Sequence, residues 1–120
     1  MNKQEKIKNF DPNSVGDVNA NMFGLPFTTQ ESETVLIPVP WEVTVSYGSG
    51  ASKGPEAILD ASFQVDLNHQ EFPELWKLGI FLDESPKGIK KNSKKYKKQA
   101  APIIEALESG MIIDHHPGLR

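Results

Sequence analysis

VLIPVPWEVTVSYGSGASKGPEAILDAS, residues 35–62, is the stretch that decides the fold. It begins with an apolar run over 35–39, continues as a glycine-rich loop, and ends in a segment with the pattern of a helix. A strand that is apolar at consecutive positions is typical of burial on both faces, as in a parallel sheet covered by helices. Pro38 has no N–H to donate, so we expect the strand to end there or to lack a partner on that side.

The helix is predicted over residues 54–64. Pro55 suits the first helical position, where its fixed φ helps and its missing N–H costs little. Glu56 in the first turn suits the positive end of the helix dipole. We expect one packing face, made of Ala57, Ile58, Ala61 and Val65.

Further along, the chain alternates between strand and helix patterns. Residues 78–82 read as a second short strand, and residues 111–114 can begin a third. A helix is predicted over 93–109, ended by Gly110, with Pro102 expected to kink it or to mark a second start. Its apolar stripe is Tyr96, Ala100, Ile103, Ile104 and Leu107. This order predicts a layered α/β fold. The predicted strands and helices are too few to cover both faces of an apolar strand. We therefore expect this chain to be a piece of a larger sheet protein or to depend on a partner.

Residues 1–33 are polar and rich in turn-forming residues, which predicts an irregular arm with a short helical turn. Apolar side chains are expected to pin this arm onto a core: Phe10, Val15, Val18, Met22, Phe23, Leu25 and Phe27. The predicted organisation is therefore an arm over 1–33 followed by an α/β segment over 34–120.

The segment after the first strand resembles the ureohydrolases, the family of arginase, agmatinase and formimidoylglutamase. The family pattern is roughly P-(F/W)-(D/E)-x-x-x-S-x-x-x-G-x-x-x-G-P-x-A-I-x-x-x-S. The chain matches it without a gap at Pro40, Trp41, Glu42, Ser46, Gly50, Gly54, Pro55, Ala57, Ile58 and Ser62. A weaker similarity extends the resemblance over roughly residues 15–110. It implies a three-layer α/β/α parallel-sheet (arginase-like) fold, of which residues 34–120 are the N-terminal part and which is incomplete in this chain.

The loop over residues 41–53 is the candidate site, because it leaves the carboxyl end of a strand, where open α/β sheets bind their ligands. In the family this loop rims the mouth of the active site, which implies a substrate-entrance role for Trp41, Glu42, Ser46 and Tyr47. The structural part of the motif is Gly50, Gly54 and Pro55. The alternative is a structural or subunit-contact loop in which Glu42 is merely solvated.

Two positions depart from the agmatinase-like pattern. Many such members carry arginine where this chain has Ser52 and Leu59. The chain therefore resembles a divergent branch of the family, and the guanidino compound that it acts on is left open.

The resemblance implies chemistry that needs two metal ions, usually manganese. The family binds them through a Gly-Gly-Asp-His motif and through Asp-Ala-His-x-Asp and Ser-x-Asp-x-Asp motifs, and a metal-bound hydroxide attacks the guanidinium carbon to release urea. None of these motifs occurs in residues 1–120, so no catalytic and no metal-binding residue is assigned. We therefore expect the N-terminal segment of a manganese-dependent ureohydrolase that binds no Mn²⁺ and is inactive by itself.

The same resemblance implies the partners. They are the remainder of the ureohydrolase domain, further copies of the complete protein in a trimer or hexamer, and a small guanidino substrate. We expect neither nucleic acid nor membrane as a partner.

A competing signal lies at Asp114-His115-His116, which follows an apolar run. It resembles the triplet that binds manganese in the DHH phosphoesterases, and carboxylate and imidazole groups both suit that ion. The earlier Asp-x-Asp motif of those enzymes is missing, so a solvent-exposed turn before Pro117 is the alternative. His69 is expected to be an ordinary surface residue.

Charge is unevenly spread over a chain whose net charge is −3. Seven lysines fall within residues 87–98, which contain no acid, whereas the rest of the chain has 6 basic and 16 acidic residues. The run predicts a solvated helix face and a flexible loop. It also leaves open a different function, a non-enzymatic α/β module that binds a partner through its loop and its lysine-rich helix.

The composition excludes several classes of protein. The chain has no cysteine, which excludes disulfides, thiolate metal sites and cysteine nucleophiles. No window approaches the roughly 20 apolar residues that a membrane helix needs, and the N-terminal lysines are not followed by an apolar signal segment. These features favour a cytoplasmic location.

Overall fold

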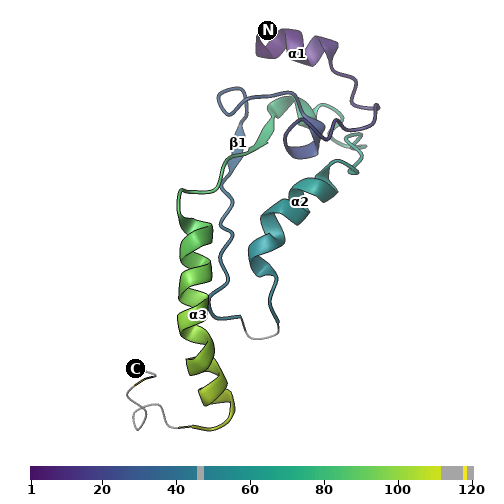
Figure 1. Cartoon of the computed structure of the whole chain (residues 1–120). Helices are drawn as coiled ribbons and strands as arrows, with labels where there is room; N and C mark the ends of the chain where they lie inside the picture. The colour runs from purple at the N-terminus through teal and green to yellow at the C-terminus, as the bar shows by residue number, and fades with distance from the viewer. Residues whose placement is uncertain (46–47, 112–117, 119–120) are drawn as a thin grey trace. The chain divides into compact units, whose positions relative to one another are not determined.

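The computed structural model describes residues 1–45, 48–111 and 118. The chain divides into two compact units, which are described separately below (Figure 1). Unit 1 comprises residues 1–38 and 55–85, and unit 2 comprises residues 39–54 and 86–120.

Unit 1 contains a two-stranded parallel sheet. Strand β1 (Thr34–Leu36) pairs with β2 (Ile80–Leu82), with Val35 opposite Phe81 in the register. Helix α2 (Gly54–Ser62) lies in the connection between them, as a parallel crossover requires. The prediction of an α/β fold with a parallel sheet is confirmed, and this arrangement is consistent with a part of an arginase-like α/β fold.

Both strands are shorter than predicted. Pairing along β1 ends with a hydrogen bond from the Asp83 N–H to the Leu36 carbonyl, at 2.9 Å, and Pro38 follows two residues later. Ahead of β2, residues Leu75–Leu78 form a 3₁₀ turn, η3, and Gly79 adopts a φ of +84°. That backbone angle is open to glycine at little cost, so the chain turns there before the strand begins.

The prediction that the first strand is buried on both faces is wrong for this chain. Val35, Leu36 and Ile37 are all exposed, and Ile37 is 66% accessible. Strands of parallel sheets are normally covered on both faces. The exposed apolar strand is therefore consistent with a sheet that is incomplete in these residues.

Asn21 binds β2 through its side chain. Its amide oxygen accepts the Leu82 N–H at 2.6 Å, and its amide nitrogen donates to the Leu82 carbonyl at 3.0 Å. The side chain thus satisfies both backbone groups of one strand residue, as a neighbouring strand would. Asn21 also precedes the short 3₁₀ turn η1 (Met22–Gly24) and accepts the Met22 N–H.

The core of unit 1 contains a cluster of three buried side chains, Leu25, Phe27 and Trp76, and Met22 is buried as well. Four partly buried residues pack against them: Ile7, Phe10, Phe23 and Leu67. Most of these lie in residues 1–33, so that segment supplies the core as well as covering it. The expected anchoring by Val15 and Val18 is wrong, because both side chains are exposed. The predicted division at residue 33 stays a prediction.

The N-terminal segment also contains a short helix, α1 (Lys3–Asn9). Asn2 and Glu5 form a capping box, in which each side chain accepts the backbone N–H of the other residue. Such reciprocal capping satisfies donors that a helix start otherwise leaves without a partner.

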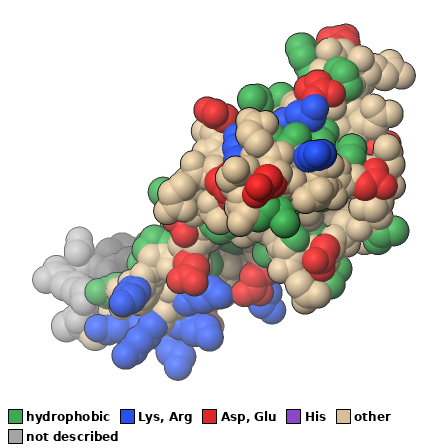
Figure 2. Space-filling model, turned by 90° about the horizontal axis from the view of Figure 1, so that it is seen from above, with side chains coloured by type: hydrophobic (Ala, Val, Ile, Leu, Met, Phe, Trp, Pro, Cys, Tyr) green, Lys and Arg blue, Asp and Glu red, His purple; other side chains and the backbone are tan. Residues whose placement is uncertain are grey.

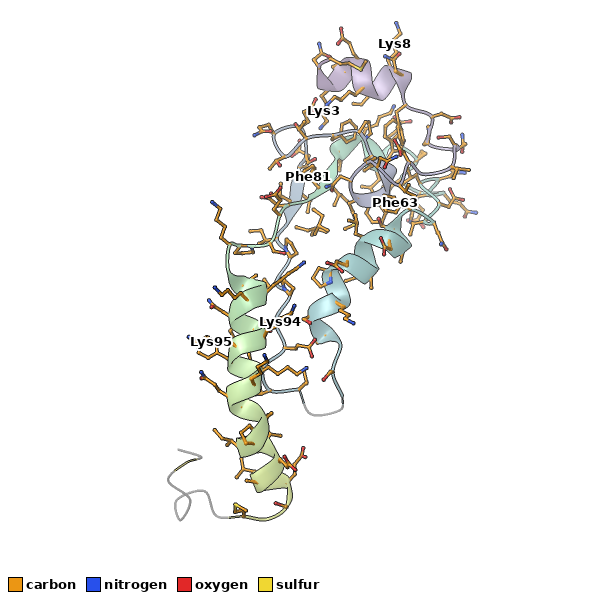
Figure 3. All side chains as sticks on the ribbon, in the orientation of Figure 1. Lys3, Lys8, Phe63, Phe81, Lys94 and Lys95 are labelled. Carbon is orange, nitrogen blue, oxygen red and sulfur yellow. The ribbon has the colours of Figure 1, made fainter. Side chains whose placement is uncertain are left out.

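Helix α2 begins where the Gly-Pro signal predicts, but the prediction of its packing face is wrong. Ile58, expected in the core, is 61% accessible, and Ala57, Ala61 and Val65 are exposed as well. The buried residue is Ser62, whose hydroxyl oxygen accepts the Phe23 N–H at 2.9 Å. The polar contact to η1, rather than apolar periodicity, sets which side of α2 faces the rest of unit 1. Phe63 follows it at the helix end (Figure 3).

Unit 2 contains one long helix, α3 (Ile89–Glu108), which starts four residues earlier than predicted and runs through Pro102 without interruption. Gly110, with a φ of +80°, ends it as expected. Ala100, Ile103 and Ile104 of the predicted stripe are half-buried, whereas Tyr96 and Leu107 are exposed. The predicted third strand falls largely on residues outside the described part of the chain.

None of the helices in the described residues is both long enough and apolar enough to cross a bilayer.

Candidate functional site

The candidate site is the loop over residues 40–53 and the face of α3 that it contacts, both in unit 2. Glu42 is its centre and is only 8% exposed. Its carboxylate accepts the Gly50 N–H at 3.1 Å, the Ser52 N–H at 3.2 Å and the Ser52 hydroxyl. These bonds tie Gly50 and Ser52 to the side chain of Glu42, which therefore fixes the position of this part of the loop.

Helix α3 contributes to the same network through residues one turn apart. Lys97 Nζ lies 2.6 Å from the Glu42 carboxylate and also donates to the Ser49 hydroxyl at 2.7 Å. Ser93, buried on the same face, accepts the Glu42 backbone N–H at 2.9 Å. Residues four apart in a helix lie side by side. The loop is therefore joined to α3 through both the backbone and the side chain of one residue.

Two glycines allow the loop to turn toward Glu42. Gly48 has a φ of +106° and Gly50 a φ of +134°, conformations that residues with a side chain adopt only with strain. At Gly50 the backbone angle directs the N–H to the carboxylate, so the glycine and the glutamate act together.

The network holds Glu42 in its charged form. The Lys97 ammonium, the Ser52 hydroxyl and the Gly50 N–H lower the pKa of Glu42 from 4.5 to about 2. Hydrogen bonds and a positive neighbour both favour a carboxylate over a carboxylic acid. The interpretation of Glu42 as merely solvated is wrong, because the side chain is buried and bonded on all sides to its own unit.

This pKa shift predicts that the loop loses its contacts with the Glu42 carboxylate only at acidic pH. The folded-state pKa is lowered, so the stabilisation by Glu42 is complete above about pH 4.5 and is lost as the pH falls through about 2. An NMR titration of the Glu42 side-chain carboxyl carbon should have its midpoint near 2 and should be accompanied by shifts of the Gly50 and Ser52 amides. A midpoint near 4.5 would contradict the network, and the Glu42→Gln variant should show no such amide transition.

Glu31 in unit 1 provides an independent comparison in the same titration. Lys6 and the Thr28 N–H lower its pKa to about 2 as well, through contacts of 2.6 and 3.0 Å. Its resonance should move in the same pH range while the loop of unit 2 is reported separately by its own amides.

Trp41 lies beside the network, and its ring is 6.2 Å from that of Tyr96 on α3. It remains 42% exposed and is thus accessible at the surface of unit 2. A groove of about 340 Å³ adjoins the loop, with Val43, Val45 and Ile104 among its apolar lining and Lys97 and Glu105 among its charged lining.

The structure describes some of the predicted site residues but not all of them. Trp41 and Glu42 lie together in unit 2, and Gly54 and Pro55 form the start of α2. Ser46 and Tyr47 lie outside the described residues. The substrate-entrance role of all four loop residues stays a prediction.

Three residues of the network were not predicted as members of the site: Ser52, Ser93 and Lys97. Ser52 appears in the sequence as a departure from an expected arginine, and Lys97 as one of seven lysines. The spacing of four between Ser93 and Lys97 was the available signal, because it places a hydroxyl and an ammonium on one helix face.

Within residues 1–45, 48–111 and 118, no three His, Cys, Asp or Glu side chains come together as metal ligands. These residues therefore do not fit a manganese pair, and no step through a metal is assigned to them. The Asp114-His115-His116 triplet lies outside the described residues. His69 is exposed, and its Nδ1 accepts the N–H groups of Glu71 and Phe72, as suits an ordinary surface residue in a turn.

Comparison with known proteins gives a short match. An N(1)-aminopropylagmatine ureohydrolase from Synechocystis sp. is 42% identical over 41 residues, which are 34% of this chain and 13% of that protein. No family model and no solved structure matches the chain. The chain is thus similar to a short part of a ureohydrolase.

Proposed function

We propose that this chain is the N-terminal segment of a manganese-dependent ureohydrolase, an enzyme that hydrolyses a guanidino group to urea and an amine. The identity of 42% over 41 residues to an N(1)-aminopropylagmatine ureohydrolase carries the proposal. The gapless motif from Pro40 to Ser62 and the parallel β1–α2–β2 arrangement agree with it. The substrate belongs to the alkylguanidines, with agmatine and N(1)-aminopropylagmatine as the first compounds to test.

The loop of unit 2 would serve this enzyme as part of the substrate entrance. Glu42 is satisfied by its own loop and by Lys97, so its role is to position the loop rather than to bind substrate. Trp41 is exposed next to this fixed point and presents an apolar ring of the kind that contacts an alkyl chain. Glu42 is thus a positioning residue, and Trp41 is the contact residue of the entrance.

The metal ions and the residues that activate water would come from other parts of the protein. None of the family's metal-binding motifs occurs in residues 1–120, and the described residues form no metal cluster. Such ions would supply activated water for the hydrolysis. This chain's own contribution is the shape and rigidity of the entrance.

Urea release tests the proposal. The coding frame that contains this chain, expressed together with the sequence that follows codon 120, should release urea with Mn²⁺ from agmatine, N(1)-aminopropylagmatine, arginine or formimidoylglutamate. The 120-residue chain alone should release none. If the following sequence encodes no Gly-Gly-Asp-His motif, or if the isolated chain turns over a guanidine, the proposal is wrong.

A second candidate function is a non-enzymatic module that binds a partner. The exposure of the apolar strand β1 favours it, because uncovered apolar surface of this kind marks an interaction site. Urea release by the expressed frame would exclude this candidate, whereas a stable complex without any guanidine turnover would support it.

A further inference from the structure

The two units carry opposite charge. Unit 1 has four lysines against twelve Asp or Glu residues, a formal charge of −8, and unit 2 has nine Lys or Arg against four acidic residues, a formal charge of +5. Eleven of the twelve acidic residues of unit 1 are exposed, and Glu31 is half-buried. Charge is therefore segregated by unit and lies at the surface, where it acts on other molecules.

The positive charge of unit 2 is concentrated on one side of α3, which we call the lysine face. It consists of Lys91, Lys94, Lys95 and Lys98, all of them exposed. Steps of three and four residues keep these side chains within one stripe, in which successive turns are about 5–6 Å apart. Figure 2 shows a dense group of Lys and Arg side chains, and Figure 3 labels Lys94 and Lys95 on α3.

The lysine face lies opposite the face of α3 that contacts the loop. Ser93, Lys97 and Ile104 point to the loop side, where Ser93 and Lys97 bind Glu42 and Ile104 lines the groove. At 100° per residue, Lys91 and Lys98 lie more than a quarter turn from this side. The lysines of the face are thus not the ones that hold unit 2 together.

The chemistry of the face favours an acidic protein surface as its partner. The face contains no arginine, the residue that binds phosphate through two hydrogen bonds. It also contains no aromatic ring on which a nucleic-acid base could stack. Tyr96, the ring beneath Lys95, packs toward Trp41. Ala100, Ile103 and Ile104 on the apolar side of α3 are half-buried, which leaves only Tyr96 and Leu107 of that side exposed, too few for the apolar stripe that enters a membrane.

We propose that the lysine face binds the acidic surface of unit 1 of a second copy of this chain. Each copy carries both surfaces, so the contact is head-to-tail, and it can add further copies unless the geometry closes a ring. The attraction acts between exposed charges and is therefore weak and sensitive to salt. This inference rests on charge and exposure, and does not depend on the ureohydrolase proposal.

Sedimentation velocity of the full chain at increasing concentration tests the contact. At about 20 mM salt the mean sedimentation coefficient should rise with concentration, and at about 500 mM salt, where the screening length falls to roughly 4 Å, it should stay that of a monomer. A triple variant with Lys91→Gln, Lys94→Gln and Lys98→Gln should stay monomeric at both salt concentrations. Circular dichroism of this variant should be unchanged, because all three side chains are exposed.

A matched control separates the lysine face from net charge. The variant with Lys8→Gln, Lys53→Gln and Lys77→Gln has the same net charge as the first triple variant, namely −6 in place of −3, and should associate at least as strongly as the unaltered chain, because it keeps the lysine face and makes unit 1 more acidic. Trace amounts of labelled unaltered chain should also bind an excess of the face variant, which retains the acidic unit 1. That mixture tests the head-to-tail arrangement directly.

Three results would overturn the proposal. Association that persists at high salt would show contacts between apolar surfaces such as that of β1. Equal association of both triple variants would show that the lysine face is not involved. Binding of a single-stranded DNA 20-mer at about 150 mM salt, with no self-association at low salt, would identify nucleic acid as the partner instead.

Discussion

Replacing Trp76 by alanine should destabilise unit 1 by about 3–5 kcal/mol, the typical loss for removing a large aromatic side chain from a core. Trp76 is 8% exposed, and its ring lies 4.9 Å from that of Phe10 and 6.4 Å from that of Phe27. Its removal opens a cavity at the centre of the apolar cluster. Because small domains are stable by only about 5–15 kcal/mol, such a loss removes a large fraction of the stability of a small unit.

Amide hydrogen exchange of β2 and η1 measures this effect, since both elements pack in unit 1. The other tryptophan provides the control, because Trp41 is 42% exposed and lies in unit 2. Trp41→Ala should cost about 1 kcal/mol and should leave exchange in unit 1 unchanged. Equal effects of the two substitutions on unit 1 would contradict the assignment of its core.

Replacing Glu42 by glutamine should release the loop of unit 2. Glutamine has nearly the same shape, but its NH₂ group is a donor, and at least one of Gly50, Ser52 and Lys97 then loses its acceptor. Losing bonds to a charged acceptor costs more than losing neutral ones. We therefore expect exchange of the Gly50 and Ser52 amides to be at least about tenfold faster, with little change in unit 1.

Two further substitutions define what the Glu42 result means. Glu108→Gln removes an equal charge from an exposed position of α3 and should leave the loop amides unchanged. Ser52→Ala removes one hydroxyl donor but keeps the Ser52 N–H, so its effect should be smaller than that of Glu42→Gln. If Glu108→Gln and Glu42→Gln behave alike, the loop is not held by the Glu42 network.

The parts of the fold that were predictable depend on local chemistry. Pro55 and Gly110 mark helix ends through their own backbone preferences, and the apolar run ahead of Pro38 marks a strand whatever its neighbours are. The core was not predictable in this way. Leu25 and Phe27 lie in an irregular segment without periodicity, and their contact with Trp76 is made across about fifty residues of chain.

The site shows the same division. Glu42 and its glycines were recognisable because the motif singles them out, but the role of Glu42 was not. Its partners on α3, Ser93 and Lys97, lie 51 and 55 positions away and belong to residue types that usually face water. A sequence pattern does not record which lysine of a run turns inward, because that choice is made by tertiary contacts.

The amide of Asn21 determines at which edge of the small sheet a further strand can pair. It occupies both hydrogen-bonding groups of Leu82, so another strand arriving next to that residue would first have to displace it. At the opposite edge of the sheet, formed by β1, no side chain of the described residues blocks the backbone in this way. Any polypeptide that completes this sheet is thus steered to one side of it, and the identity of that strand, once known, reveals how the rest of the molecule is assembled.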